Sequence, residues 1–225
     1  MKIILFLDTE TSGLPERNRL KHSSFYPPEM YEKYDNARMI EIACSLYELN
    51  EQTSEMFHIK SFSSLVVPNG FTIENDSIHG ITTDKANTYG NALQNVLQIF
   101  HYEFLNHANE IIGHNIEYDM NILLSESYRI THDIRNHAPY QGTRNNLRTS
   151  NMQYETLYEE LKKKPTKCTM KIGQKVLKLQ KYPKLIELYS VFNPNGKHQN
   201  HRALEDVQWT SVCYTGLRKM INDTD

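Results

Sequence analysis

The first strongly patterned segment of the chain is a run of apolar residues that ends in acids. Residues 3–7 are all apolar, which predicts a strand buried on both faces, and Asp8, Thr9 and Glu10 follow directly. Side chains two positions apart on a strand point to the same side, so Asp8 and Glu10 should place two negative charges together at the edge of a core. These carboxylates would repel each other, and a divalent cation between them would remove the repulsion. Two solvated acids at an exposed strand end are the alternative.

The rest of the chain divides into short apolar runs and segments with helical spacing. The apolar runs predict strands at 2–7, 39–48, 56–67 and 110–113, and a short strand near Cys168 to Met170. Helical spacing predicts helices at about 91–106, 116–128, 183–192 and 202–221. Strands first, then strands that alternate with helices, indicate an α/β fold with a mixed central sheet and helices on both sides. We expect one domain over residues 1–225, with loop insertions near 15–38 and 136–167.

A third acid lies on the helix predicted after Asn115, which is a good N-cap residue. Ile116, Met120 and Leu123 form an apolar stripe on this helix, and Asp119 lies at the edge of the inward face. A carboxylate buried alone is costly, so Asp119 needs a partner. A metal ion is one such partner, and a hydrogen bond to backbone or to an arginine is the alternative.

A histidine and a fourth acid occur near the C-terminus. The turn residues 193–196 precede a new helix that starts near His201. Residues five apart do not share one face of a continuous helix. We therefore expect His201 at or before the first turn and Asp206 inside the helix, so that both approach one point. A surface histidine and an exposed aspartate are the ordinary alternative.

Four segments together resemble the DEDDh exonucleases, the family of ribonuclease T and of the proofreading subunit of bacterial replicative polymerases. Residues 8–14 resemble its first motif, Gly113-His114-Asn115 with Asp119 the second, and His201-x-Ala203-x-x-Asp206 the third. Residues 78–82 resemble its substrate-side loop. The order and spacing fit from residue 2 to about residue 215. The resemblance implies the ribonuclease H-like arrangement and a 3′–5′ exonuclease that releases nucleoside 5′-monophosphates.

The residue types indicate the chemistry of this site. Carboxylates without cysteine favour hard cations, so we expect two Mg²⁺ or Mn²⁺ ions, about 4 Å apart, held by Asp8, Glu10, Asp119 and Asp206. His201 would act as the general base that takes a proton from the attacking water. By resemblance, the terminal nucleotide would be held by Thr11, Leu14, His79, Gly80, Ile81 and Asn115.

The nature of the nucleic acid is less determined by the residues. We expect DNA as the substrate. A large apolar Leu14 that wedges between terminal bases would favour single-stranded or frayed 3′ ends. An exoribonuclease that trims RNA 3′ ends is the alternative, since discrimination depends on how the pocket meets a 2′-hydroxyl. A non-catalytic nucleic-acid-binding module would be expected to lack a carboxylate, and all four are present. The residues do not identify a polymerase partner.

Composition and charge add two expectations. The 39% hydrophobic and 23% charged residues describe a soluble globular protein, and three separated cysteines argue against a disulfide framework or a zinc site. No membrane span is expected, and an intracellular, cytoplasmic location is the default. Although the net charge is −2, nine lysines and no acid lie between Lys162 and Lys184. This segment predicts a surface that follows phosphates, with a solvated helix face as the alternative.

Overall fold

The computed structural model describes residues 1–18, 25–137, 144–194 and 202–222, with the backbone alone for 133–137 and 144–153. Its centre is a five-stranded sheet in the order β3-β2-β1-β4-β5. The strands are β1 (Lys2–Thr11), β2 (Met39–Leu49), β3 (Met56–Leu65), β4 (Glu110–Gly113) and β5 (Thr166–Cys168). Antiparallel pairs join β3, β2 and β1, whereas β4 and β5 run parallel to β1. The mixed α/β sheet predicted from the sequence is therefore confirmed.

β1 is longer than the predicted strand at 2–7, because its pairing with β2 continues to Thr11 opposite Met39. The acids after the apolar run therefore lie inside the strand. The two faces of β1 enter different parts of the core. Leu5 and Leu7 pack with α3 (Leu93–Glu103), α4 (Ile116–His137) and α5 (Arg144–Lys163), whereas Ile4 and Phe6 pack with α8 (Ala203–Asn222).

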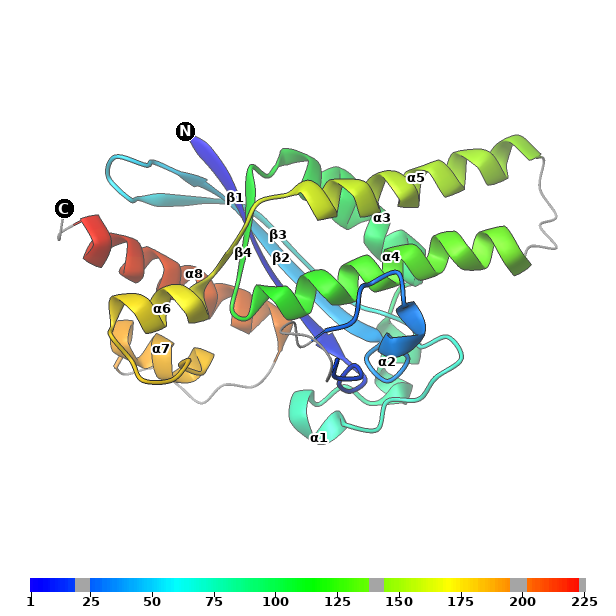
Figure 1. The fold of residues 1–225 in the computed structure, drawn as a ribbon, viewed down its shortest axis with the longest axis horizontal. Helices are drawn as coiled ribbons and strands as arrows, with labels where there is room; N and C mark the ends of the chain where they lie inside the picture. Colours follow the sequence, from blue (N-terminus) through cyan, green and yellow to red (C-terminus); the bar gives the residue numbers. More distant parts are fainter. Residues whose placement is uncertain (19–24, 138–143, 195–201, 223–225) are drawn as a thin grey trace.

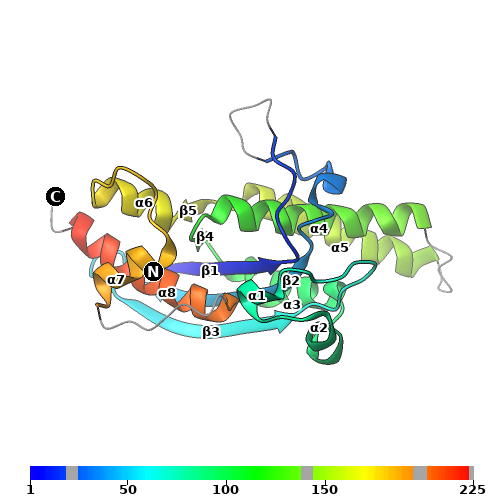
Figure 2. The same ribbon diagram turned by 90° about the horizontal axis from the view of Figure 1, so that it is seen from below.

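Helices cover both faces of this sheet, and Figure 2 shows β1 running between α4 and α8. Two further helices, α6 (Thr169–Val176) and α7 (Leu185–Phe192), extend the α8 side through a small apolar cluster around Leu188, Trp209 and Leu217. None of the described helices is long and apolar enough to cross a membrane. The remaining described α-helices are α1 (Asp76–His79) and α2 (Thr83–Tyr89).

The segment expected to be a loop insertion at 136–167 is largely helical. α4 continues beyond its predicted end at 128, and α5 runs beside it, so that the pair extends away from the sheet (Figure 1). The reason is visible in α5, where Tyr154, Leu157, Tyr158 and Leu161 recur at helical spacing and are buried. The strand expected near 168–170 is also displaced, because β5 ends at Cys168 and the next residue begins α6.

The segment at 15–38 is attached to α4 in its described part. A 3₁₀-helix (Tyr31–Tyr34) places the buried Tyr34 in the core. Arg129 of α4 donates to Asp35 Oδ1 at 2.7 Å and to the Tyr31 carbonyl at 2.8 Å. This part of the segment is therefore fixed against the helix that carries Asp119.

Candidate active site

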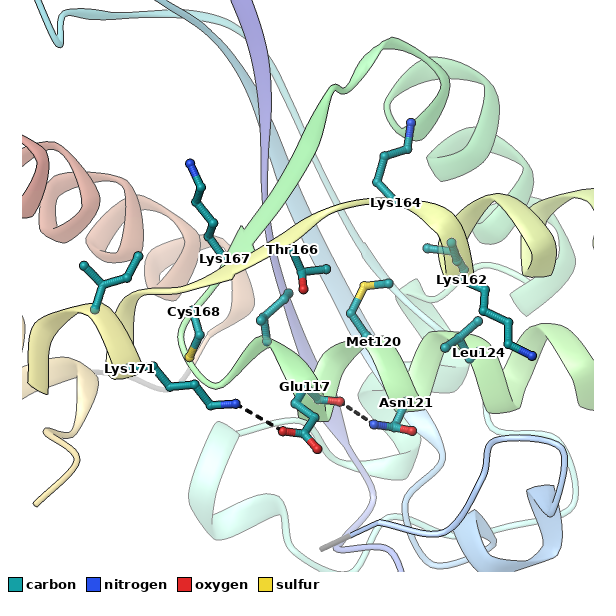
Figure 3. A pocket seen from close by; sticks show the side chains of 13 residues that line it. Glu117, Met120, Asn121, Leu124, Lys162, Lys164, Thr166, Lys167, Cys168 and Lys171 are labelled. Atoms are coloured by element: carbon teal, nitrogen blue, oxygen red, sulfur yellow. Dashed lines mark hydrogen bonds and ion pairs between the residues drawn. The ribbon is translucent and has the colours of Figure 1, made fainter. Parts of the chain in front are cut away.

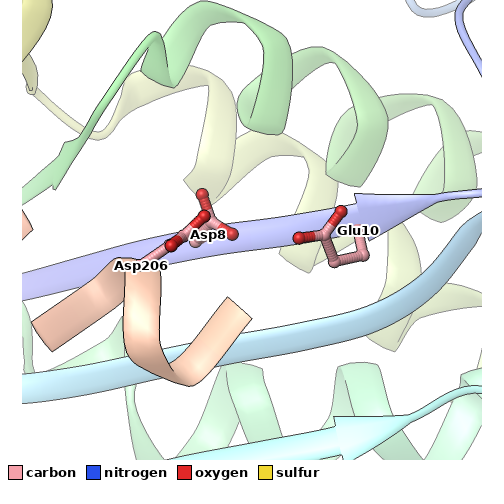
Figure 4. A group of neighbouring side chains, drawn as sticks. All are labelled: Asp8, Glu10 and Asp206. Carbon is pink, nitrogen blue, oxygen red and sulfur yellow. The ribbon is translucent and has the colours of Figure 1, made fainter. Parts of the chain in front are cut away.

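Three carboxylates from β1 and α8 converge at the carboxyl end of β1. Asp8 and Glu10 project from the face of β1 that packs on α8, as the period of two predicted, and Asp206 of α8 points toward them (Figure 4). One ligand oxygen from each of the three residues lies within 4.8 Å of the other two. Asp206 is almost completely buried, and the other two are half-buried. The two β1 acids are therefore brought to a third acid almost two hundred residues away.

Asp119 approaches the same point from the opposite face of the sheet. Its carboxylate is 3% exposed and accepts two hydrogen bonds through Oδ1, from the Thr9 amide at 2.9 Å and from Thr9 Oγ1 at 2.8 Å. Thr9 lies between Asp8 and Glu10, so this contact fixes α4 against the strand that carries both acids. Asp119 also raises the pKa of Asp8 through its negative charge.

The fold holds these acids close together although they repel one another, and their pKa values are raised. Burial, followed by the charges of Asp119, Asp206 and Glu10, raises the pKa of Asp8 well above its usual range. Burial and the neighbouring acids raise the pKa of Glu10 to about 8. Burial also raises the pKa of Asp119 to about 7, against the hydrogen bonds from Thr9, which lower it. Such an arrangement favours a positive charge among the carboxylates.

A fifth acid, which none of the sequence motifs indicated, adjoins this cluster. Glu41 lies opposite Glu10 in the β1–β2 register and is 1% exposed. Arg202 binds it through Nη2 at 2.6 Å and Nε at 3.1 Å, and the Ala203 amide donates to it at 3.2 Å. A charged residue inside the apolar run of residues 39–43 was the signal that could have identified Glu41.

His201, the predicted general base, lies outside the described residues, so its role stays a prediction. The chain is described again from the next residue, Arg202, and α8 begins at Ala203. Asp206 thus lies inside α8, as expected, and belongs to its first turn.

At the end of β1, Thr11 is buried and its hydroxyl contacts the Gly13 carbonyl at 2.7 Å and the Tyr118 hydroxyl. Tyr118 donates to the same carbonyl at 3.1 Å. Burial raises the pKa of Tyr118, so its phenol stays protonated. Leu14, just beyond this junction, is 70% exposed. The turn after β1 is therefore held to α4 while it presents an apolar side chain outward.

The loop predicted to contact substrate divides into buried and exposed residues. Ile81 is fully buried with Ile40 and Ala86, and His79 is buried and accepts a hydrogen bond from the Ile81 amide at 3.1 Å. Gly80 between them adopts a φ of 67°, which closes α1. Ile78, in contrast, is 57% exposed. The accessible apolar side chain of this loop is therefore that of Ile78, which directly precedes the residues 79–81 expected to hold the nucleotide.

Two further contacts place these segments. Asn75 donates through Nδ2 to the Thr11 carbonyl at 3.1 Å, which joins the start of α1 to the end of β1. Asn115, the predicted cap of α4, is exposed and has a φ of 68°, and its carbonyl accepts from the Tyr118 amide at 2.9 Å. Both the α1 segment and the start of α4 therefore lie next to Thr11, the last residue of β1.

Comparison with known proteins gives consistent results. The sequence model described as "RNase_T: Exonuclease" matches residues 5–212. No curated protein sequence matches the chain significantly. E. coli exonuclease I in complex with a dA16 oligonucleotide superposes with a TM-score of 0.58 at 15% identity, and exonuclease I from Methylocaldum szegediense with 0.59 at 18%. Each covers 97% of this chain, which spans only 41% of either exonuclease I chain.

A third solved structure is that of a 3′-exonuclease, described as showing 3′-end specific recognition of a histone mRNA stem-loop. It superposes with a TM-score of 0.54 at 15% identity and covers 99% of this chain and 82% of its own. At these identities the structural matches show the shared fold, which is the ribonuclease H-like arrangement.

Proposed function

The chain belongs to the exonuclease family, and we propose that it is a metal-dependent 3′–5′ exonuclease that releases nucleoside 5′-monophosphates from 3′ ends. The observation that carries this proposal is the convergence of Asp8, Glu10 and Asp206 within 4.8 Å, with Asp119 hydrogen-bonded to the residue between the two β1 acids. Holding like charges together costs free energy unless cations offset them. The composition of the site therefore supports a metal-dependent reaction on a phosphodiester.

The donor set fits hard divalent cations. All four side chains offer oxygen only, and none of the described cysteines lies in the cluster, which favours Mg²⁺ or Mn²⁺. We propose that Asp8, Glu10, Asp119 and Asp206 hold two such ions. When bound, the ions would stabilise the attacking and leaving oxygens of the phosphodiester.

The protein's own groups supply proton transfer and positioning. His201 is proposed as the general base that accepts a proton from the attacking water, on the basis of its place in the third motif. Arg202, the next residue, is held by the buried Glu41, so the chain on the C-terminal side of His201 is anchored. Precise placement of a proton acceptor is what general base catalysis requires.

The terminal nucleotide is proposed to lie against Leu14 and Ile78. Both side chains are exposed and apolar, and their segments are joined by the contact of Asn75 with Thr11. We propose Asn115 and the hydroxyl of Thr11 as the polar residues of the same nucleotide site. His79, Gly80 and Ile81 would contribute by fixing the shape of the loop that carries Ile78. Apolar side chains that meet bases favour unpaired ends, because a base must leave its stack to reach them.

Single-stranded DNA is the proposed substrate and RNA is the second candidate. One solved structure of E. coli exonuclease I holds a dA16 oligonucleotide, and the 3′-exonuclease is described as recognising the 3′ end of an mRNA stem-loop. Both proteins share the fold of this chain.

The proposal is tested with purified protein and matched oligonucleotides labelled at the 5′ or the 3′ end, as DNA and RNA, single- and double-stranded. A 3′–5′ exonuclease shortens the 5′-labelled strand stepwise, in the presence of Mg²⁺ or Mn²⁺, and releases the 3′ label at once as a mononucleotide. The comparison of DNA with RNA identifies the substrate.

Variants separate this activity from a contaminant. Asp8→Asn and Asp206→Asn should abolish turnover, whereas Asp84→Asn, at an exposed acid of α2, should retain it. Full activity in EDTA, or of Asp8→Asn, would exclude the metal mechanism proposed for this site.

A further inference from the structure

Four of the nine lysines of the lysine-rich segment line a cavity that the proposed chemistry does not use. The cavity of about 500 Å³ lies between α4, β5 and the start of α6 (Figure 3). Met120 and Leu124 contribute apolar walls, and Lys162, Lys164 and Lys171 surround them. Glu117, which pairs with Lys171 at 3.4 Å, is the one acid among the residues that line it.

A second cavity, of about 540 Å³, lies between α6 and the C-terminal half of α8. Its walls include the apolar Leu217 and the ring of Tyr214. Its cations include Lys175, Lys178 and Arg218, and none of the described residues that line it is an acid. The surface is thus apolar in its walls and positive at its edge.

The two cavities are neighbours. Lys167 of β5 and Ile172 of α6 line both of them, so they meet at the outer edge of the sheet, where β5 is the last strand. Figure 3 shows Lys167 and Lys171 extending to opposite sides of the β5–α6 connection. We use the name "β5 groove" for these two cavities together.

The cations of the β5 groove differ in whether they form ion pairs with carboxylates of the protein. Lys162 pairs with Glu29 at 3.1 Å, and Lys167 pairs with Glu110 at 3.2 Å. Among the described residues, no carboxylate forms an ion pair with Lys175, Lys178 or Arg218. The α6–α8 end therefore holds positive charge that an external anion could neutralise.

Two local features at this end concern Lys178 and Arg218. Lys178 has a φ of 53° just after α6, a position where glycine is strongly preferred because a Cβ is strained there. Arg218 Nε is buried and has no hydrogen-bond partner among the described residues. The φ of Lys178 belongs to the end of α6, where the Leu179 amide bonds to the Gln174 carbonyl at 2.9 Å. The Arg218 guanidinium donates through Nη2 to the Glu51 carbonyl at 3.4 Å, so it is held in place without neutralisation of its charge by a described carboxylate.

We propose that the β5 groove binds the single-stranded part of a nucleic acid whose 3′ end occupies the carboxylate cluster. This inference rests on the proposed function. A nucleobase suits the apolar walls, including the Tyr214 ring, and the phosphates on either side suit the cations. Arg218 follows Asp206 by twelve residues on α8, or about 18 Å along the helix axis, so this end lies beyond the reach of the terminal nucleotide.

The competing explanation is that the lysines only prevent another strand from pairing with the edge strand β5, which is a common role of edge lysines. That role requires charge near β5, but it does not require an apolar cavity between α6 and α8 with cations at its edge. The nucleic-acid explanation accounts for both the charge and the cavity.

The test compares two double variants that lose the same charge from the same segment. Lys175→Gln/Lys178→Gln changes the β5 groove, and Lys163→Gln/Lys181→Gln changes two exposed lysines that line neither cavity. All four side chains are exposed, so both variants should fold, and thermal unfolding checks this. Binding of a long labelled single strand is measured by fluorescence anisotropy in EDTA, over a range of salt concentrations.

The groove variant should bind the long strand about tenfold more weakly, and the slope of log affinity against log salt should flatten by about 1.4, or about 0.7 per lost phosphate contact. The control variant should match the wild-type protein. With Mg²⁺ present, the wild-type protein should have a lower KM for the long strand than for a trinucleotide. The groove variant should have similar KM values for both substrates.

The results separate failure of this inference from failure of the proposed function. If the wild-type protein hydrolyses neither the trinucleotide nor the long strand, the proposed function is wrong. If it hydrolyses either of them, and the two double variants bind the long strand equally, the β5 groove is not a nucleic-acid site. Binding of an acidic peptide with an apolar C-terminal residue, without binding of the oligonucleotide, would also overturn the inference.

Discussion

Arg202 binds the buried carboxylate of Glu41 through two nitrogen atoms, although the two residues are 161 positions apart. The pair joins β2, directly beside Glu10, to the residue that precedes α8. The same carboxylate accepts from the Ala203 amide, so it also fixes where α8 begins. Because Asp206 follows in the first turn, this ion pair sets the position of one wall of the carboxylate cluster.

We expect Arg202→Ala to lower both stability and activity. It leaves Glu41 buried without its charged partner, which should cost about 1.5–3 kcal/mol of unfolding free energy, toward the lower value because the guanidinium is partly exposed. kcat should fall about 10–100-fold, because small displacements of a catalytic group are costly. Urea unfolding and steady-state kinetics measure the two effects. The double variant Glu41→Gln/Arg202→Gln should lose less unfolding free energy than the sum of the losses in the two single variants. A loss equal to that sum would show that the two side chains are not coupled.

Thr9→Val tests the contact that holds Asp119. It removes the hydroxyl donor with little change in shape, and Asp119 keeps only the amide hydrogen bond. Since both hydrogen bonds lower the pKa of Asp119, which is about 7 in the intact site, their partial loss should raise it further. The acid limb of kcat/KM against pH should therefore move to higher pH. Thr9→Ser keeps the hydroxyl and should keep the wild-type profile.

Metal affinity should rise with pH up to about 8. Without metal, the pKa of Glu10 is about 8 and that of Asp119 about 7, so metal binding at neutral pH must displace protons. Titration calorimetry with Mg²⁺ in two buffers of different ionisation enthalpy measures this release. Glu10→Gln should bind Mg²⁺ more weakly and release fewer protons, and binding without proton release would contradict the electrostatics described for the cluster.

His114 should make the folded protein sensitive to acid. Its ring is hydrogen-bonded to the Pro183 carbonyl and to Thr169, and burial lowers its pKa to about 4. The unfolded chain would protonate this histidine near pH 6.5, so between about 6.5 and 4 the unfolded state binds a proton that the folded state does not. Stability from this group is therefore lost as the pH falls through that range. Denaturant unfolding of His114→Gln should depend less on pH there, and an equal dependence would argue against a neutral buried imidazole.

His201→Ala tests the predicted general base, which lies outside the described residues. kcat should fall about 10²–10⁴-fold, the usual contribution of a positioned general base, while Mg²⁺ binding changes little. The variant should also lose the acid limb of the kcat profile that belongs to the histidine. Wild-type kcat, or a loss explained by weaker metal binding alone, would exclude this role.

The sequence alone determined the features that depend on neighbouring residues. The period of two along β1 placed Asp8 and Glu10 on one face, and the apolar stripe of α4 placed Asp119 at the inward edge, because side-chain direction follows from local backbone geometry. The order of the acidic motifs indicated the family, which the match over residues 5–212 confirms.

The tertiary structure decided what depends on residues far apart in the chain. The partners of Thr9 and Glu41 lie 110 or more positions away, and no local pattern specifies them. The same holds for the loop of α1, where burial against Ile40 made Ile81 a core residue and left Ile78 exposed. The lysine-rich segment could be counted from the sequence, but only the packing of α6 on α8 separated the lysines around a cavity from those in solvent. Chemical type and local periodicity are properties of neighbouring residues, whereas burial and pairing arise only when the whole chain folds.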